Sequence, residues 1–321
     1  MRPTSCIRST AMIPAAIFVS KKIMKQISNN IVKTWNRFPV ISRAILSGFF
    51  VSSIGVFTWG GLLSTSMSAW VILPMILILG LYWKFFSGDR TPWRFNKFRQ
   101  EQFRTTKLTP AGWKWGSIAA LLFVAVVQSS FVITFRLFTF PAAKFTADYK
   151  MLGNFPVLAS WAIIVMSSVV AGICEEAGFR GYMQVPLEKK YGMIKGILIT
   201  SIFFSVIHLG HTWALPILPH IFIASLLLGI IAFKSGSLIP GIIGHSILDV
   251  FDYAIWWTNI TGGFKQHTIF ITGIDLHFIT WVLIFLSALY GFVKAIGMLH
   301  KANDTVLTCA GINNQQSISI R

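Results

Sequence analysis

Charged residues are scarce in this 321-residue chain, and acidic residues are the scarcest of them. Only 12% of the residues are charged, and 10 Asp and Glu stand against 28 Lys and Arg. Hydrophobic residues make up 54% of the chain, and its mean hydropathy is +0.67. Because soluble domains carry about 25% charged residues, this composition excludes a soluble globular protein. It predicts an all-α fold, a polytopic membrane helical bundle.

Cysteine is also rare. Cys6, Cys174 and Cys309 lie far apart and form no Cys-x-x-Cys motif, which excludes a disulfide framework and a thiolate zinc site. The net charge of +18 would suggest a nucleic-acid partner in a soluble protein. Here the basic residues lie between apolar segments, where they act as topology signals. No nucleic-acid partner is therefore predicted.

Eight apolar segments are predicted to cross the bilayer. They cover residues 44–63, 69–83, 116–135, 155–175, 193–209, 215–233, 239–257 and 279–299. An earlier apolar run, residues 11–20, is too short to span, and the lysines that follow it argue against a cleaved signal peptide. Nearly all of the 28 Lys and Arg fall on alternate loops, which predicts that both termini are cytoplasmic. The compact loops favour a bacterial plasma (inner) membrane over the endoplasmic reticulum.

The chain accordingly divides into five expected parts. These are a basic cytoplasmic N-terminal segment (1–43), transmembrane helices with a basic cytoplasmic connector (44–135), a transmembrane core that holds the polar motifs (155–257), a loop and the last transmembrane helix (258–299), and a polar tail (300–321). The core is where functional residues are expected, because its polar groups interrupt apolar segments.

Two carboxylates, Glu175 and Glu176, end an apolar segment of helical length. An ionisable group at membrane depth costs roughly 2.5–3.5 kcal/mol, so such groups usually mark function; interfacial charges at a helix end are the alternative. Glu176 and Arg180 are four residues apart and share a helix face, which predicts a structural pair and leaves Glu175 for chemistry. Residues 182–191 are mixed and charged, so they predict a helix end or a short surface helix. The acids would then lie near an interface.

Two later segments also carry polar groups at membrane depth, namely His208, and His245 with Asp249. His245 and Asp249 are four residues apart, so their side chains should lie about 5–6 Å apart on one helix face and address one water or substrate oxygen. Phe204, one turn before His208, should line the pocket. A single histidine in a helix is more often a satisfied core residue, but three segments that each supply reactive groups favour a catalytic site. Other ionisable groups near the span ends are expected to be bystanders: His211, His220 and Asp252. Asp252 is three residues after Asp249, however, and could hydrogen-bond the site.

Three blocks together resemble the CAAX protease and bacteriocin-processing family of intramembrane endopeptidases, which includes the prenyl-protein CAAX endopeptidases. The resemblance covers roughly residues 157–253 and matches the family in order and spacing. Its blocks are Glu-Glu-x-x-x-Arg (Glu175, Glu176, Arg180), Phe-x-x-x-His (Phe204, His208) and His-x-x-x-Asn/Asp (His245, Asp249). The first three predicted spans carry no motif of this family.

The resemblance implies an all-helical membrane protein that hydrolyses peptide bonds of a membrane-tethered, CAAX-like protein or peptide in the lipid bilayer. It implies that Glu175 and His208 activate water, and that His245 with Asp249 stabilises the developing oxyanion. Many members carry Asn at the last position. Because an ionised Asp249 would repel an oxyanion, it must either stay protonated or orient His245.

The sequence does not decide whether the protein uses a metal cofactor. Glu175, His208 and His245 would make a three-ligand zinc set with one open position, and a metal-free route is the alternative. The metal-free route is preferred, because Glu176 is expected to be taken by Arg180 and a metal-bound Glu175 would leave the water without a proton acceptor. No His-Glu-x-x-His motif occurs, nor the Gly-x-Ser-Gly of rhomboid proteases or the Gly-x-Gly-Asp of presenilin-type proteases.

Two other functions fit the same residues. One is a non-hydrolytic membrane binding or bacteriocin-immunity protein that retains the pocket, and the other is a transporter that uses Glu175 and Asp249 as a proton relay. The complete set of one acid, two imidazoles and a further carboxylate favours the enzyme, because binding alone does not need it.

Overall fold

The structure is a computed structural model and describes residues 30, 33–66, 68–89, 95–147 and 149–309. The chain divides into two compact units, Met1–Arg43 and Ala44–Arg321. Expectations for the run 11–20 and for residues 310–321 lie outside the described residues. Within the described residues the chain is helical, and the sole β pairing is an isolated bridge between Thr105 and Ser237. The all-α prediction is confirmed.

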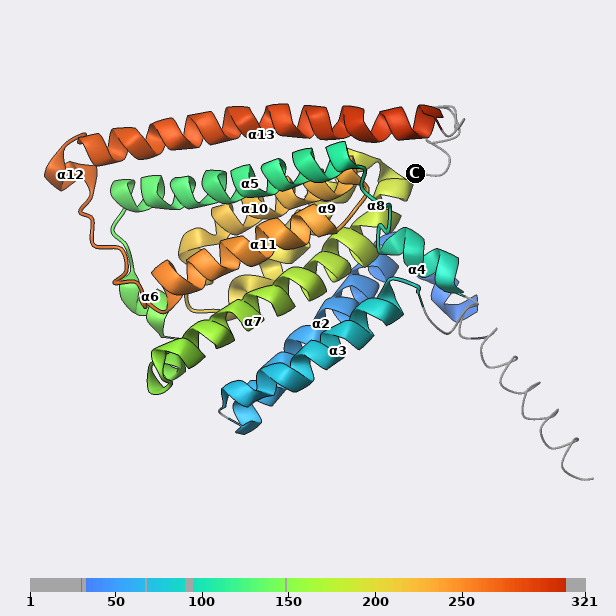
Figure 1. Cartoon of the computed structure of the whole chain (residues 1–321), viewed down its shortest axis with the longest axis horizontal. Helices are drawn as coiled ribbons and strands as arrows, with labels where there is room; N and C mark the ends of the chain where they lie inside the picture. The colour runs from blue at the N-terminus through green and yellow to red at the C-terminus, as the bar shows by residue number, and fades with distance from the viewer. Residues whose placement is uncertain (1–29, 31–32, 67, 90–94, 148, 310–321) are drawn as a thin grey trace, which may run out of the picture. The chain divides into compact units, whose positions relative to one another are not determined.

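The second unit is a bundle of long helices joined by short ones (Figure 1). The long helices are α2 (Val40–Ser66), α3 (Ile72–Phe86), α5 (Pro110–Leu137), α7 (Val157–Glu175), α9 (Met193–Ile207), α10 (Ala214–Ser235), α11 (Ile239–Phe251) and α13 (Leu276–Cys309). The short ones are η1 (Ala69–Val71), α4 (Asn96–Gln102), α6 (Ala142–Thr146), η3 (Lys150–Asn154), α8 (Gln184–Tyr191), η5 (His208–Gly210) and α12 (Ile269–Thr272). Two π-helical stretches, η4 (Glu176–Met183) and η6 (Asp252–Trp257), continue α7 and α11.

Seven helices of the described part are long and apolar enough to cross a membrane: Val40–Thr65, Ala69–Phe86, Pro110–Leu137, Val157–Tyr191, Met193–Gly210, Ala214–Ser235 and Leu276–Ala302. The chain is thus a multi-pass membrane protein. The remaining expected span, residues 239–257, forms α11 and η6 but is not among the seven. Its polar residues lower its hydropathy, and α5 and α7 both pack against it, so neighbouring helices shield these residues from lipid. An eighth crossing stays a prediction.

One helix differs from the expectation. The chain is helical without interruption from Val157 to Tyr191, through α7, η4 and α8, rather than ending near Glu175. At 1.5 Å per residue this helix is about 50 Å long, well beyond the roughly 30 Å of a hydrocarbon core. Glu175 and Glu176 therefore lie inside a long helix and not at its end. Of the two alternatives for residues 182–191, the helix end is observed and the separate surface helix is not.

Small residues let the core helices approach closely. A Cβ atom on Gly172 of α7 would lie 2.2 Å from Ser246 Oγ of α11, so only glycine permits this contact. A Cβ on Gly178 of η4 would lie 2.5 Å from the carbonyl oxygen of Gly48 in α2. These two contacts hold the carboxylate-bearing helix between α2 and α11.

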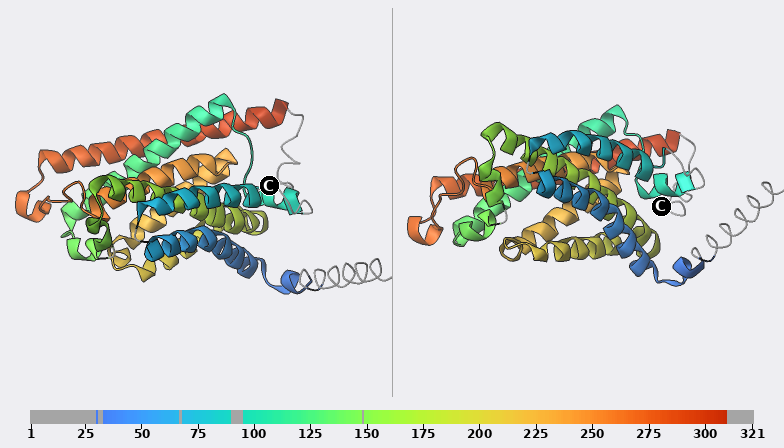
Figure 2. Two further views of the ribbon diagram at one scale, coloured as in Figure 1. Left: turned by 60° about the horizontal axis from the view of Figure 1, so that its bottom comes forward. Right: turned by 90° about the horizontal axis from the view of Figure 1, so that it is seen from below.

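The described part of the connector between α3 and α5, from residue 95 onward, packs against the bundle. Phe103 is buried, and Arg104 donates a hydrogen bond from Nε to the carbonyl oxygen of Arg180 at 2.9 Å. Arg104 also pairs with Glu188 of α8 at 2.6 Å. Figures 1 and 2 show α4 and α8 at one end of the bundle and α6 and α12 at the other. Through Arg104, the connector is thus attached both to the π-helical stretch η4 and to α8.

Candidate active site

Glu175 and Glu176 stand where α7 changes into the π-helix η4. In a π-helix the backbone hydrogen bonds join residues five apart, rather than four apart as in an α-helix, and such segments occur frequently at functional sites. Glu176 is completely buried, and the side chain of Glu175 is 14% exposed. The Oε2 atom of each carboxylate is buried without a hydrogen-bond partner among the described atoms. Each carboxylate thus keeps a free oxygen in the interior.

His245 of α11 lies between the two carboxylates. Its Nδ1 donates to Glu176 Oε1 at 2.8 Å, and its Nε2 lies 3.9 Å from Glu175 Oε2. Nε2 is also 3.7 Å from Asp249 Oδ1, as the four-residue spacing on one helix face predicts. The imidazole is thereby fixed through one nitrogen, while the other faces Glu175 and Asp249.

Arg180 completes the buried charge pair with Glu176. Its Nη1 lies 3.0 Å from Glu176 Oε1, and neither side chain is exposed. Nη2 donates to Ser225 Oγ at 3.1 Å, and the guanidinium lies 4.4 Å from the ring centre of Phe204. The expected pairing of Glu176 with Arg180 is observed. Glu176 does more than the sequence suggested, however, because the same oxygen also accepts the hydrogen bond from His245.

His208 caps the end of α9 one turn after Phe204. Its Nδ1 donates to the backbone carbonyl of Phe204 at 2.7 Å. A carbonyl oxygen only accepts, so the proton sits on Nδ1 and Nε2 carries the lone pair in the neutral ring. The ring centres of Phe204 and His208 are 4.7 Å apart. The local helix thus sets the tautomer that leaves Nε2 able to accept a proton.

A small cavity gathers most of these groups. It has a volume of about 60 Å³, and its lining includes Phe204, His208, His245 and Asp249. One water molecule needs roughly 10–15 Å³ measured in this way, so the cavity has room for water but not for a peptide. Glu175 does not line it and borders it through His245. The three sequence blocks therefore converge in space.

Several lining residues were not expected to take part. His220, expected to be a bystander, lines the cavity, and so does Asp252, for which the sequence allowed a hydrogen-bonding role. Asp252 Oδ1 accepts a hydrogen bond from Gln128 Nε2 at 2.6 Å, and Gln128 Oε1 accepts one from Trp256 Nε1 at 2.9 Å. Gln128 is a polar residue in the middle of an apolar span, and that feature alone was a signal of its importance.

The suggested zinc ligands do not form a metal site in this arrangement. Among the residues that the structure describes, no three His, Cys, Asp or Glu side chains are placed to hold one metal ion. Nδ1 of His208 and Nδ1 of His245 are both engaged in hydrogen bonds, which leaves Nε2 of each ring as the nitrogen that could face a metal. As they are placed, Glu175, His208 and His245 are not gathered around one metal position.

Comparison with known proteins gives a family for the central helices. Residues 157–251 match the family described as Type II CAAX prenyl endopeptidase Rce1-like. No curated protein and no solved structure was found to match the chain. The matched residues contain Glu175, His208, His245 and Asp249, so the segment that builds the cavity is the segment that matches. Residues 157–251, slightly under a third of the chain, are thus similar to the Rce1-like family of type II CAAX prenyl endopeptidases.

Proposed function

We propose that this protein is an intramembrane endopeptidase that hydrolyses a peptide bond of a membrane-tethered, CAAX-like protein or peptide. The observation that carries the proposal is the convergence of His208, His245 and Asp249 on one small buried cavity, with Glu175 beside it. Three helices supply these groups at membrane depth, where polar side chains are disfavoured unless they serve a function. The family match supports the reaction class.

In the proposed reaction Glu175 and His208 activate a water molecule. Nε2 of His208 accepts a hydrogen bond from the water, and Glu175 takes one of its protons through the oxygen that has no partner. The hydroxide attacks the carbonyl carbon of the scissile bond. Glu175 then returns the proton to the leaving amine as the carbon–nitrogen bond breaks. No atom other than those of water, substrate and these side chains is needed.

His245 and Asp249 are proposed to stabilise the oxyanion of the tetrahedral intermediate. Because Nδ1 of His245 is committed to Glu176, only Nε2 can donate to the oxyanion, and it must carry a proton when it does so. Asp249 lies 3.7 Å from this nitrogen and is proposed to act in its protonated form as the second donor. Glu176 and Arg180 are proposed to position the imidazole.

The topology belongs to the same proposal. With seven crossings the termini would lie on opposite sides of the membrane, and with eight they share a side. We count α11 with η6 as the eighth crossing, because α5 and α7 flank it within the bundle. The distribution of Lys and Arg then supports a cytoplasmic location for both termini, and the compact loops support a bacterial plasma membrane. A C-terminal alkaline phosphatase fusion should be inactive and the corresponding fluorescent-protein fusion bright; the reverse result would refute eight crossings.

The central experiment compares the membrane proteomes of cells that produce the wild type or Glu175→Gln. The substitution keeps the size of the side chain but removes the proton acceptor, so new peptide termini should appear only with the wild type. A general base usually contributes about 10²–10⁴ in rate, so the loss should be nearly complete.

The matched control is Glu101→Gln, which removes a carboxylate that pairs with Lys189 at the surface. Its proteome should equal that of the wild type. If Glu175→Gln, produced at equal level, yields the same peptide termini as the wild type, the protease proposal fails. A binding or immunity protein would give no wild-type cleavage at all.

A further inference from the structure

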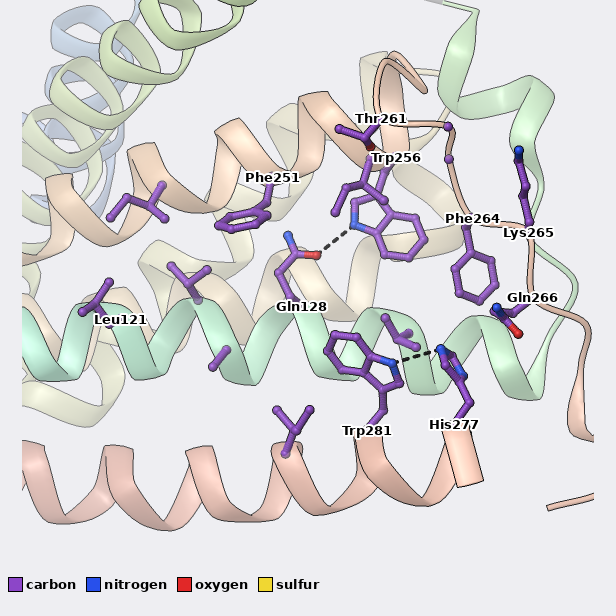
Figure 3. Close-up of a pocket in the computed structure, with 18 residues that line it drawn as sticks. Leu121, Gln128, Phe251, Trp256, Thr261, Phe264, Lys265, Gln266, His277 and Trp281 are labelled. Atoms are coloured by element: carbon purple, nitrogen blue, oxygen red, sulfur yellow. Dashed lines mark hydrogen bonds between the residues drawn. The ribbon is translucent and has the colours of Figure 1, made fainter. Parts of the chain in front are cut away.

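A second, larger hollow lies on the opposite side of Gln128 and Trp256 from the cavity. This groove has a volume of about 790 Å³ and is bounded by α5, by α11 with η6, by α13 and by the loop that follows η6 (Figure 3). Small-molecule sites commonly measure about 300–1,000 Å³, so its size suits a bound molecule. None of Glu175, His208, His245 and Asp249 lines it.

The groove opens on the outer surface of the bundle. Leu121 of α5, Phe251 of α11 and Ile284 of α13 line it and are 55%, 45% and 37% exposed. Two of these helices, α5 and α13, are membrane-spanning, so the exposed apolar side chains face lipid. The groove is therefore accessible from the bilayer rather than only from water.

The interior of the groove offers little hydrogen bonding. The main polar side chain in the interior is that of Gln128. It already accepts a hydrogen bond from Trp256 and donates one to Asp252. An extended peptide would leave its backbone groups unpaired at such a site, which costs several kcal/mol per group in an apolar environment. A hydrocarbon chain needs no such partners. The interior thus selects a hydrocarbon over a polypeptide.

Polar groups gather at one end of the groove. Figure 3 shows Lys265, Gln266 and His277 at the end opposite Leu121. Lys265 is exposed, and no carboxylate of the described residues forms an ion pair with it. The nearby acid Asp275 is instead held by Arg136, at 2.7 Å. This end therefore presents an unneutralised positive charge at the edge of an apolar groove.

We propose that this groove binds one anionic phospholipid of the surrounding bilayer. An acyl chain lies between α5, α11 and α13, and the phosphate faces Lys265 at the loop end. Charge complementarity at one end and an apolar interior at the other match the two parts of such a lipid. Trp281, which lies near His277 in the groove wall, suits the headgroup region, where tryptophan is enriched. The site is separate from the proposed catalytic groups and does not depend on their roles.

The test counts lipids that stay bound to the purified full-length protein. The protein is equilibrated in micelles that contain phosphatidylglycerol or phosphatidylcholine, and native mass spectrometry records the bound molecules. The wild type should retain one phosphatidylglycerol in preference to phosphatidylcholine. Lys265→Gln should weaken phosphatidylglycerol retention about fivefold, the contribution expected of one lysine near a lipid headgroup, and leave phosphatidylcholine unchanged. Ala125→Phe fills the groove from α5 and should abolish retention of both lipids.

Two matched variants control for charge and bulk. Lys144→Gln removes an exposed lysine on α6 that does not line the groove, and Ala111→Phe adds the same ring at an exposed position of α5 outside it. Both should retain lipid as the wild type does. Equal retention by wild type and Lys265→Gln, an equal preference for both lipids, or a dimer whose contact covers the groove would overturn the proposal. If Ala125→Phe does not fold, the Lys265→Gln comparison with Lys144→Gln decides by itself.

Discussion

The proposed catalytic cavity and the α5–α11–α13 groove share a wall but differ in both size and chemistry. The cavity measures about 60 Å³ and is lined by His208, His245 and Asp249, whereas the groove measures about 790 Å³ and has an apolar interior. Gln128 belongs to the groove lining and donates its hydrogen bond to Asp252 on the cavity side. The larger hollow would be the first choice for an active site by size alone. The proposed site is chosen by its reactive side chains and not by its volume.

The difference in size also bears on how a substrate would enter in the proposed reaction. The cavity has room for water but not for a peptide, so a peptide substrate would have to displace part of the cavity wall. Trp213 and Trp257 stack at 4.8 Å and both line the cavity. A stacked indole pair can separate without breaking a helix, and such a motion would admit the scissile bond. The groove needs no such opening, because it already faces the bilayer.

The largest expected effect concerns the ion pair beside the cavity. Arg180→Ala leaves the carboxylate of Glu176 buried without its cation, which should destabilise the fold by about 3–5 kcal/mol. Thermal unfolding in detergent would measure this loss. Lys189→Ala is the control, because its pair with Glu101 is 36% and 44% exposed, and it should change stability by less than about 1 kcal/mol. Glu175→Gln should accumulate better than Arg180→Ala; equal melting temperatures for those two would contradict the assigned roles.

The next prediction tests whether Asp249 acts as a hydrogen-bond donor to the oxyanion. Asp249→Asn keeps the shape and a hydrogen-bond donor beside His245, so cleavage should persist. Asp249→Val removes the donor and should reduce kcat by about 10²–10³, the usual effect of losing one oxyanion donor. Cleavage of a substrate identified by the proteome comparison would be followed for both variants. If Asp249→Asn is as inactive as Asp249→Val, the carboxylate acts in its ionised form and the oxyanion role is wrong.

A smaller effect is expected at the shared wall. Gln128→Leu removes the donor to Asp252 and the acceptor for Trp256, both in the interior. Leaving a buried polar group unsatisfied costs about 1–3 kcal/mol, so the melting temperature should fall measurably. Gln266→Leu, at the exposed edge of the groove, should change stability by less than about 0.5 kcal/mol. An unchanged melting temperature for Gln128→Leu would mean that these two hydrogen bonds do not stabilise the fold.

The smallest effect concerns pH at the polar end of the groove. Hydrogen bonds from Arg136 lower the pKa of Asp275 to about 2. An unfolded Asp titrates near 3.9, so the pair contributes its full stability above that pH and loses it as the pH falls toward about 2. The melting-temperature difference between wild type and Asp275→Asn should therefore be small and constant from pH 7 to about pH 5, and then shrink. A difference that changes between pH 7 and pH 5 would require another titrating group.

Local spacing along the chain determined a good part of the site. The pairs Glu176–Arg180 and His245–Asp249 are each four residues apart, and helical geometry alone brings their side chains together. The apolar composition likewise determined the membrane bundle, because only helices with satisfied backbone groups suit a chain of this kind. The zinc set could not be judged from spacing, since its three members come from different helices.

The contacts between those helices were decided by tertiary packing. Glu176 reaches His245 because Gly172 lets α7 approach α11, and Asp252 meets Gln128 because α5 packs on the same helix. The uninterrupted helix through Tyr191 and its π-helical stretch could not be predicted from the sequence either. A local change in the number of residues per turn leaves no clear signal in hydrophobic periodicity. The sequence determines which residues share a helix face, because neighbours along a helix have a fixed geometry. The faces that meet depend on packing between distant segments, which no local spacing encodes.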